Sequence, residues 1–205
     1  MSTENDAYRK FLPYVRDAEM TVLHDDGLYR HIQFGGRGAV GWFELVTWPG
    51  KLSITGDIGG WVFARTDDMF GFFAGPDGQI NPGYWAEKIV AGGPTNVFSA
   101  DLFASKVVDY FWSRREQYEG EAADLFREIR LDVLDYDEDE TAARTGLETF
   151  RYTPENGQRD FIFRDSWEWD FTDWSIHYLR ACHAIVWGIN RYRTAQTLTP
   201  EVGRG

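Results

Sequence analysis

Short apolar runs alternate with tight turns between residues 19 and 65. Each run is rich in β-branched and aromatic residues, and a break that contains glycine separates it from the next. Turns this short join antiparallel neighbours, because a parallel pair needs a crossover of about a dozen residues or more. We therefore expect an antiparallel meander sheet over about residues 19–65, made of the runs MTVLH, LYRHIQF, AVGWFELVTW, KLSIT and WVFAR.

After Arg65 the apolar positions recur at three- and four-residue steps, which predicts helices. The segment NPGYWAEKIVAGG is expected to be helical from its cap Asn81 to the terminator Gly92-Gly93-Pro94. The final helix, over about residues 172–193, has the clearest pattern. Gly188 lies among its large rings, which predicts close packing against a neighbouring element.

Together these elements indicate an α+β fold, in which an antiparallel sheet packs with several helices and a long C-terminal helix. A length of 205 residues and a hydrophobic content of 43% are typical of one globular domain. The expected single domain, residues 1–205, has a sheet-rich half at 19–65, a helical half at 66–150 and 172–193, and a small hairpin near 148–170 around the turn Asn156-Gly157.

The stretch TWPGKLSITGDIGGW, residues 47–61, places several tight bends beside large rings. Pro49 and Gly50 suit the central positions of a hairpin turn. One residue with positive φ normally suffices for a turn, so the pair Gly59-Gly60 predicts a close approach of another element or a ligand to the backbone. Asp57 is expected to be held there by nearby backbone amides.

Aromatic and basic residues around this stretch form a candidate pocket. Rings near turns, with a few cations beside them, suit a nucleotide through stacking and phosphate contact. The alternative is that the rings belong to the core. The candidate pocket for a ligand or partner consists of Trp48, Asp57, Trp61, Arg65, Tyr84, Trp85 and Lys88. Its three Trp rings are expected to line one concavity, with Arg65 or Lys88 at the rim.

The chain has 33 acidic and 21 basic residues and a formal net charge of −12. DNA and anionic membranes attract cationic patches, so we expect no direct binding to DNA and none to a membrane. The acidic stretch LDYDEDE is either a solvated surface or a surface that faces a basic protein partner in place of nucleic acid. The candidate partner surface consists of Asp135, Asp137, Glu138, Asp139 and Glu140.

The compartment is indicated by the cysteine count and by hydropathy. Cys182 is the single cysteine, so an internal disulfide and a multi-cysteine zinc site are excluded. The polar start MSTENDAYRK predicts no signal peptide, and no apolar run approaches the roughly 20 residues of a membrane span. We expect a reducing, aqueous interior.

Histidines and acids supply few candidates for chemistry. His24 and His31 flank the first hairpin and could approach each other across it, but no metal site and no cofactor are expected. Cys182 and His183 are adjacent, so on a helix they diverge and form no nucleophile–base pair. Four acids are candidates for paired carboxylates: Glu44, Asp57, Asp67 and Asp68. Two of them facing a pocket would act as acid and base or hold a divalent ion. The alternative is structural, with Asp57 capping a turn and Asp67 and Asp68 at a helix N-terminus.

One motif resembles a known family. An aromatic, an acid, two aliphatics and Thr-Trp-Pro-Gly (residues 43–50) precede Gly-Asp, an aliphatic and Gly (residues 56–59). With DDMFGFF, NPGYWAEK, FSADLF and AIVWGI, this pattern is similar to a family of uncharacterised accessory proteins of tailed phages and prophages. The resemblance implies expression in the cytoplasm of a bacterial host, and by analogy a binder of host machinery.

These observations lead to one expected function and two alternatives. We expect a phage-encoded, non-enzymatic binding protein without catalytic residues, whose acidic surface faces a host protein. Its purpose would be to interfere with a host process or an antiphage defence system. The alternatives are a pocket that sequesters or processes a nucleotide, and an accessory of the virion or its assembly. The residues predict no oligomeric state.

Overall fold

The computed structural model describes residues 3–74, 79–136, 139–155, 157 and 159–198. The chain divides into two compact units: unit 1 is Met1–Thr95 with Trp174–Gly205, and unit 2 is Asn96–Asp173. Separate groups of buried apolar side chains lie in the two units. The single domain over residues 1–205 stays a prediction, because two compact units of one chain can unfold together or separately.

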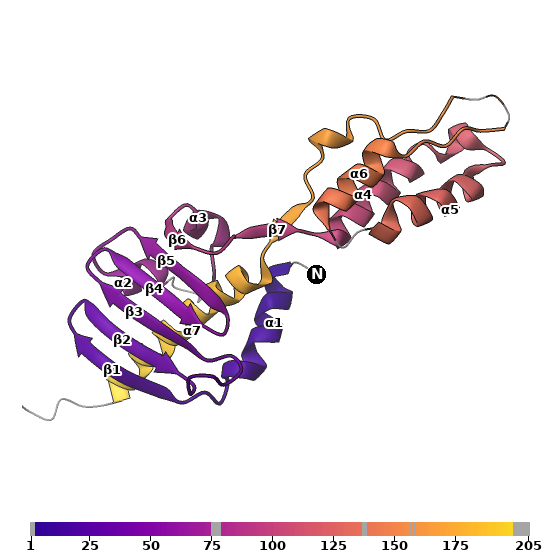
Figure 1. Cartoon of the computed structure of the whole chain (residues 1–205). Coiled ribbons are helices and arrows are strands. Elements are labelled where there is room, and N and C mark those ends of the chain that lie inside the picture. The colour runs from indigo at the N-terminus through magenta and orange to yellow at the C-terminus, as the bar shows by residue number, and fades with distance from the viewer. Residues whose placement is uncertain (1–2, 75–78, 137–138, 156, 158, 199–205) are drawn as a thin grey trace, which may run out of the picture. The chain divides into compact units, whose positions relative to one another are not determined.

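Six strands of unit 1 form one antiparallel sheet, in which each strand pairs with its neighbours in the sequence (Figure 1). The strands are β1 (Met20–Asp26), β2 (Tyr29–Phe34), β3 (Phe43–Trp48), β4 (Lys51–Gly56), β5 (Gly59–Ala64) and β6 (Ile89–Gly92). The first five strands confirm the predicted meander. With the helices described next, they also confirm the α+β fold.

The sixth strand corrects the predicted helix over NPGYWAEKIVAGG. Asn81 does cap a helix, since its side chain accepts a hydrogen bond from Tyr84 N at 3.2 Å, but α3 (Pro82–Ala86) ends after five residues. β6 follows and pairs with β5, with Ala91 opposite Val62. The β-branched pair Ile89-Val90 favours a strand, and β5 offers it backbone hydrogen bonds that a longer helix would leave unmade.

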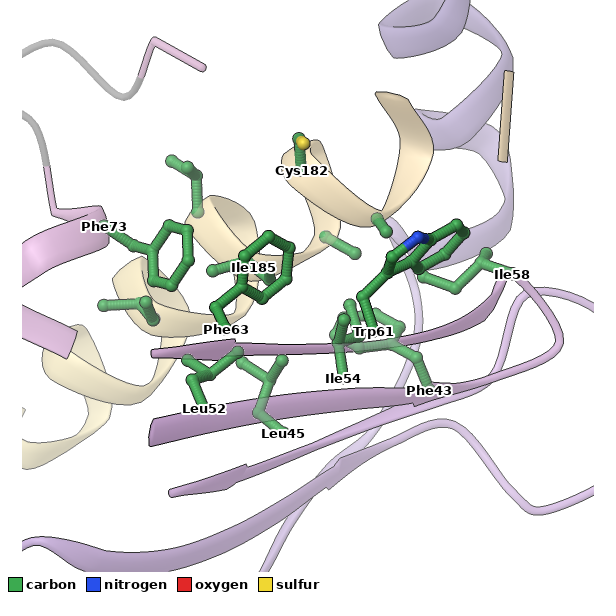
Figure 2. Close-up of a cluster of buried hydrophobic side chains, with 14 of the residues drawn as sticks. Phe43, Leu45, Leu52, Ile54, Ile58, Trp61, Phe63, Phe73, Cys182 and Ile185 are labelled. Atoms are coloured by element: carbon green, nitrogen blue, oxygen red, sulfur yellow. The ribbon is translucent and has the colours of Figure 1, made fainter. Parts of the chain in front are cut away.

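Helices pack against one face of this sheet. They are α1 (Thr3–Val15), α2 (Met69–Phe73), α3 and the long helix α7 (Ile176–Leu198). Figure 2 shows Leu52, Ile54 and Phe63 pointing from the strands toward α7, where Cys182 and Ile185 lie. α7 confirms the predicted C-terminal helix, although it begins four residues later than expected.

Alternation along β3 separates the two faces of the sheet. Phe43 and Leu45 are fully buried beneath the helices. Glu44, Val46 and Trp48 point the other way and are half-buried. An antiparallel sheet commonly keeps one solvated face, so this pattern by itself indicates no binding surface.

Unit 2 is mainly helical. Its elements are β7 (Asn96–Phe98), α4 (Ala100–Trp112), η1 (Arg115–Tyr118), α5 (Ala122–Asp132), η2 (Leu134–Tyr136), α6 (Glu140–Thr149), η3 (Ser166–Glu168) and β8 (Thr172–Trp174), where η marks a 3-10 helix and β8 ends at the boundary with unit 1. The predicted hairpin near 148–170 is reduced to one antiparallel bridge between Tyr152 and Phe161. Asn156 of its predicted turn lies outside the described residues.

Candidate functional site

The structure does not bring the three tryptophans of the candidate pocket into one concavity. Trp61 and Trp85 are only 3% and 5% exposed, and both belong to the core of unit 1. Trp61 packs beside Tyr178 with ring centroids 5.8 Å apart, and Trp85 packs edge-on against Phe73 at 4.8 Å. Trp48 points to the opposite face of the sheet. The expectation that these rings line one site is therefore wrong.

The other members of the candidate pocket lie at the surface. Lys88 Nζ lies 4.4 Å from the centre of the Tyr84 ring and 3.0 Å from Glu87 Oε2. Arg65 is exposed at the end of β5. The backbone joins the two regions, since Ala64 N donates to Lys88 O at 2.8 Å. These residues form an ordinary polar edge around a buried aromatic core.

Glycines around Trp61 explain the sharp bends of residues 47–61. A Cβ at Gly59 would lie 2.9 Å from the Trp61 ring, and one at Gly92 would lie 2.6 Å from it. Trp61 Nε1 donates a hydrogen bond to Gly93 O at 2.9 Å. The group close to Gly59 is the indole of Trp61 from the same strand, so the predicted approach of another element or a ligand to Gly59-Gly60 is wrong. Gly60 makes only ordinary contacts.

Asp57 is held by a backbone amide, as expected: its Oδ2 accepts a hydrogen bond from Gly41 N at 2.8 Å. It also lines a small hollow of about 100 Å³ that Tyr14 of α1 and Arg180 of α7 share. The Nε of Arg180 is buried without a hydrogen-bond partner in the structure. A polar hollow of this size has room for water that could hydrogen-bond both charged groups.

Glu44 occupies the centre of a polar network on the solvent face of the sheet. Its carboxylate lies 3.0 Å from His31 Nε2 and accepts hydrogen bonds from Arg37 at 3.2 Å and from Thr55 at 3.2 Å. Burial alone would raise the pKa of Glu44, but the hydrogen bonds from His31, Arg37 and Thr55 outweigh it and hold that pKa below its ordinary value. An ionised carboxylate with these partners is suited to structure rather than to proton transfer.

Asp57 is not among the hydrogen-bond partners of Glu44, so these two of the acids considered for acid–base chemistry are not joined by a hydrogen bond. His24 and His31 do lie opposite each other on β1 and β2. Among the described residues, however, no three His, Cys, Asp or Glu side chains are placed to hold a metal ion.

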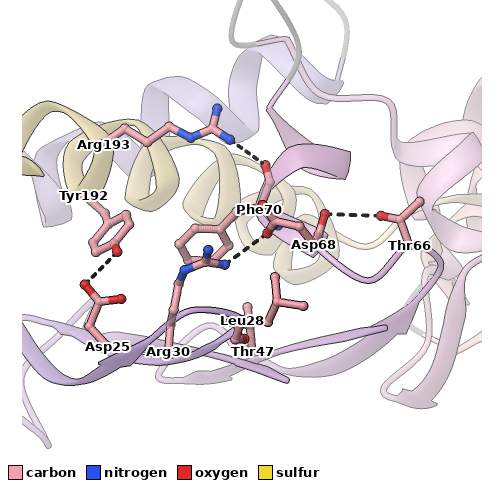
Figure 3. A network of polar contacts seen from close by, with 9 residues as sticks. All are labelled: Asp25, Leu28, Arg30, Thr47, Thr66, Asp68, Phe70, Tyr192 and Arg193. Carbon is pink, nitrogen blue, oxygen red and sulfur yellow. Dashed lines mark hydrogen bonds and ion pairs between the residues drawn. The ribbon is translucent and has the colours of Figure 1, made fainter. Parts of the chain in front are cut away.

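A second polar network joins the C-terminal half of α7 to the sheet (Figure 3). Tyr192 OH donates to Asp25 Oδ2 at 2.8 Å, and Arg30 Nη1 donates to Asp68 Oδ1 at 3.0 Å. Burial raises the pKa of Tyr192, and the hydrogen bond to Asp25 raises it further. Asp68 also accepts from Phe70 N, so it caps α2 as well as pairing with Arg30. These contacts hold α2 and α7 against the sheet.

Two members of the acidic stretch have structural roles. Asp139 caps α6 by accepting a hydrogen bond from Ala142 N at 3.0 Å. Glu140 forms an ion pair with Arg144 at 2.9 Å. Asp135 is exposed in η2, whereas Asp137 and Glu138 lie outside the described residues.

The negative charge of the chain is concentrated in unit 2. Residues 96–173 contain 20 acidic and 9 basic residues, a net charge of −11, whereas the remaining residues contain 13 and 12 and carry −1. On α5 the exposed acids Asp124, Glu128 and Asp132 follow at four-residue steps and share one face. We name Asp124, Glu128, Asp132 and Asp135 the acidic stripe. The spacing of these acids is visible in the sequence, but the concentration of charge in one unit is not, because it depends on the boundaries of unit 2.

None of the helices in the described part of the chain is long and apolar enough to cross a membrane. No protein-family model matches the chain, and no curated protein and no solved structure shows significant similarity to it.

Proposed function

We propose that the chain is a non-enzymatic binding protein that uses the acidic stripe of unit 2 to bind a basic surface of another protein. The observation that carries this proposal is the segregation of charge: unit 2 carries −11 and the rest of the chain −1. Negative charge that only keeps the protein in solution would do so equally well if it were spread over both units. A concentrated negative field instead steers a positively charged partner toward one unit.

The placement of the acidic stripe also argues against a purely structural role. Like charges at four-residue steps destabilise a helix by about 0.2–0.5 kcal/mol per pair. Asp132 is the last residue of α5, where the helix dipole disfavours a negative charge. Arg127 pairs with Asp124, but Glu128 and Asp132 make no ion pair with a described residue. Binding to a basic partner would offset these unfavourable terms.

The resemblance to accessory proteins of tailed phages supports a partner in the bacterial host. A host protein that binds nucleic acid presents a basic groove, and the acidic stripe offers such a groove carboxylates in place of phosphates. In this proposal the protein interferes with a host process or defence system by occupying that groove. It works by binding in the host cytoplasm, and it turns over no substrate.

Charge neutralisation tests the proposal. Host proteins captured from a bacterial lysate are purified, and their binding is measured over a salt series with the wild type and with a variant carrying Asp124→Asn, Glu128→Gln, Asp132→Asn and Asp135→Asn. The matched control neutralises four exposed acids of unit 1: Asp17, Glu19, Asp26 and Asp67.

We expect the variant of the acidic stripe to associate several-fold more slowly and to show a flatter salt dependence, while the control behaves like the wild type. Equal association rates and equal salt slopes in all three proteins would refute the proposal. It would also be refuted if no host protein bound to the wild type. Multiple turnover of nucleotides, esters or peptides, with or without divalent ions, would refute the non-enzymatic part.

A further inference from the structure

A groove of about 400 Å³ lies within unit 2, between the C-terminal end of α6 and the segment 162–167. This volume is within the range of roughly 300–1,000 Å³ that small-molecule sites occupy. Apolar side chains, cations and acceptors all face it, which is the combination that orients a polar ligand. Six of its lining residues carry the argument: Leu147, Glu148, Thr149, Arg151, Arg164 and Trp167.

Trp167 supplies an open aromatic face. Its residue is 67% exposed, and no described ring or cation contacts the indole, although most of the aromatic side chains of unit 2 are packed in ring pairs. The backbone turn that begins at Asp165 leads into Trp167. Asp165 has a left-handed backbone with φ 57°, and its carbonyl accepts a hydrogen bond from Glu168 N at 3.1 Å. An exposed indole that lines a groove is available for stacking.

Arg164 supplies an available cation at the same groove. Its backbone N–H donates to Tyr110 OH at 2.9 Å, which anchors its position. Its exposed guanidinium forms no ion pair with a described residue. Arg151, the second cation of the groove, is already paired with Asp160 at 2.8 Å. An anionic group of a ligand would therefore be attracted mainly to Arg164.

Hydrogen-bond acceptors line the opposite side. α6 ends at Thr149, and its last bond runs from Phe150 N to Gly146 O at 3.0 Å. The carbonyl oxygens of Leu147, Glu148 and Thr149 receive no hydrogen bond from a described residue, as is usual at a helix C-terminus. The exposed carboxylate of Glu148 adds two more acceptor atoms. This side of the groove therefore suits a ligand that carries N–H donors.

We propose that this groove binds a mononucleotide. The base stacks on Trp167 and donates its N–H groups to the open carbonyls of α6 and to Glu148, while the phosphate pairs with Arg164. A planar ring, N–H donors and an anion are the three features that the groove can recognise, and a nucleotide combines them. The proposal concerns a different surface from the acidic stripe, so either proposal can fail without the other.

The net charge of unit 2 opposes an anionic ligand through distant acids and, within the groove, through Glu148 and Asp165, which line it. At physiological ionic strength the screening length is about 8 Å, so distant acids contribute little beside a guanidinium in direct contact. Salt screens both the repulsion from these acids and the attraction of the phosphate to Arg164, so the two effects should partly cancel. We therefore expect a shallow salt dependence of nucleotide binding, unlike the steep dependence expected for a protein partner.

Calorimetric titration of the full chain with AMP, GMP, CMP, UMP and adenosine tests this site. We expect at least one nucleotide to bind with 1:1 stoichiometry. Trp167→Ala should weaken binding about fivefold or more, because base stacking is lost, and Trp167→Phe should restore most of it. Arg164→Gln should weaken nucleotide binding about tenfold and abolish any preference for AMP over adenosine.

The matched control is a second exposed tryptophan of the same unit. Trp112 is 52% exposed and lies beneath Arg115 at 4.4 Å, outside the lining of the groove. Trp112→Ala and Arg115→Gln should leave nucleotide binding unchanged. No binding of any of the four nucleotides at millimolar concentration would overturn the proposal. Binding that survives both Trp167→Ala and Arg164→Gln, or that is lost equally in the Trp112 control, would also overturn it.

Discussion

Gly188 of α7 lies directly against the ring of Phe34 of β2. A Cβ added at Gly188 would stand 2.9 Å from Phe34 Cε2 and 3.0 Å from Leu45 Cδ1. Phe34 is fully buried and stacks on Phe43 with ring centroids 4.7 Å apart, so the ring cannot move aside without disturbing the core. The close approach of helix and sheet therefore depends on this glycine, which confirms the close packing that its place among large rings predicts.

Gly188→Ala should destabilise the protein. Overpacking destabilises a fold by about 1–3 kcal/mol, whereas the higher helix propensity of alanine stabilises it by about 1 kcal/mol. We therefore expect the free energy of unfolding to fall by up to about 2 kcal/mol. Urea titration monitored by circular dichroism measures it. Gly71→Ala is the control, because the nearest atom to its added Cβ is 3.9 Å away. The prediction is wrong if Gly188→Ala is as stable as wild type.

Trp85→Ala should behave as a core substitution rather than as the loss of a binding residue. Trp85 is 5% exposed and packs edge-on against Phe73, so we expect a loss of about 3–5 kcal/mol of stability. The adjacent Tyr84 is 41% exposed, and Tyr84→Ala should cost about 1 kcal/mol or less, mainly through its contact with Lys88. Thermal unfolding of the two variants separates these roles. Equal melting temperatures would contradict the burial of Trp85.

The meander was predictable because its information is local. Each hairpin of residues 19–65 joins neighbours in the sequence, and the alternation of FELVTW shows which side chains face the core. β6 was not predictable in this way. Its segment carries the start signals of a helix at Asn81 and Pro82, and its strand forms only because β5, far away in the sequence, offers an edge.

The candidate pocket failed for a related reason. A tryptophan beside a glycine break indicates a ligand or a core equally well, and only the pairing of β5 with β6 shows that Gly59 and Gly92 pack on Trp61. The groove at Trp167 was missed because it depends on where α6 ends. A signal for the acidic stripe was present, since Asp124, Glu128 and Asp132 repeat at four-residue steps.

The free energy of unfolding should depend on pH through the ionisation of Glu44. Its pKa is lower in the folded protein than the ordinary value of a Glu carboxyl in an unfolded chain. Such a carboxylate stabilises the fold fully above the unfolded pKa, and this contribution is lost as the pH falls through the folded pKa. We therefore expect the difference in unfolding free energy between wild type and Glu44→Gln to shrink as the pH is lowered from 6 to about 3.

Urea titrations at several pH values measure this difference. Glu19→Gln is the control, because Glu19 is exposed and makes no ion pair with a described residue. Its difference from wild type should stay close to zero throughout. A constant difference for Glu44→Gln across the pH range would show that its hydrogen bonds stabilise the fold without linkage to its ionisation.

Unit 1 should fold without unit 2. Ser175 N donates a hydrogen bond to Thr95 O at 2.8 Å, so the chain leaves and re-enters unit 1 at two adjacent points. A linker of about four Gly and Ser residues is long enough to join such points, because each residue spans up to about 3.3–3.6 Å. The core of unit 1 is formed from its own side chains, among them Phe34, Trp61 and Ile185.

We therefore expect a variant in which this linker replaces residues 96–173 to unfold cooperatively, with slow amide exchange in β3 and β4. A matched variant with the same linker and Gly188→Ala should be destabilised by the same amount as in the full chain, since the atoms nearest to the added Cβ belong to Phe34 and Leu45 of unit 1. A linker variant that shows no cooperative transition would mean that unit 1 depends on unit 2. In that case the two units form the single domain that the sequence predicts.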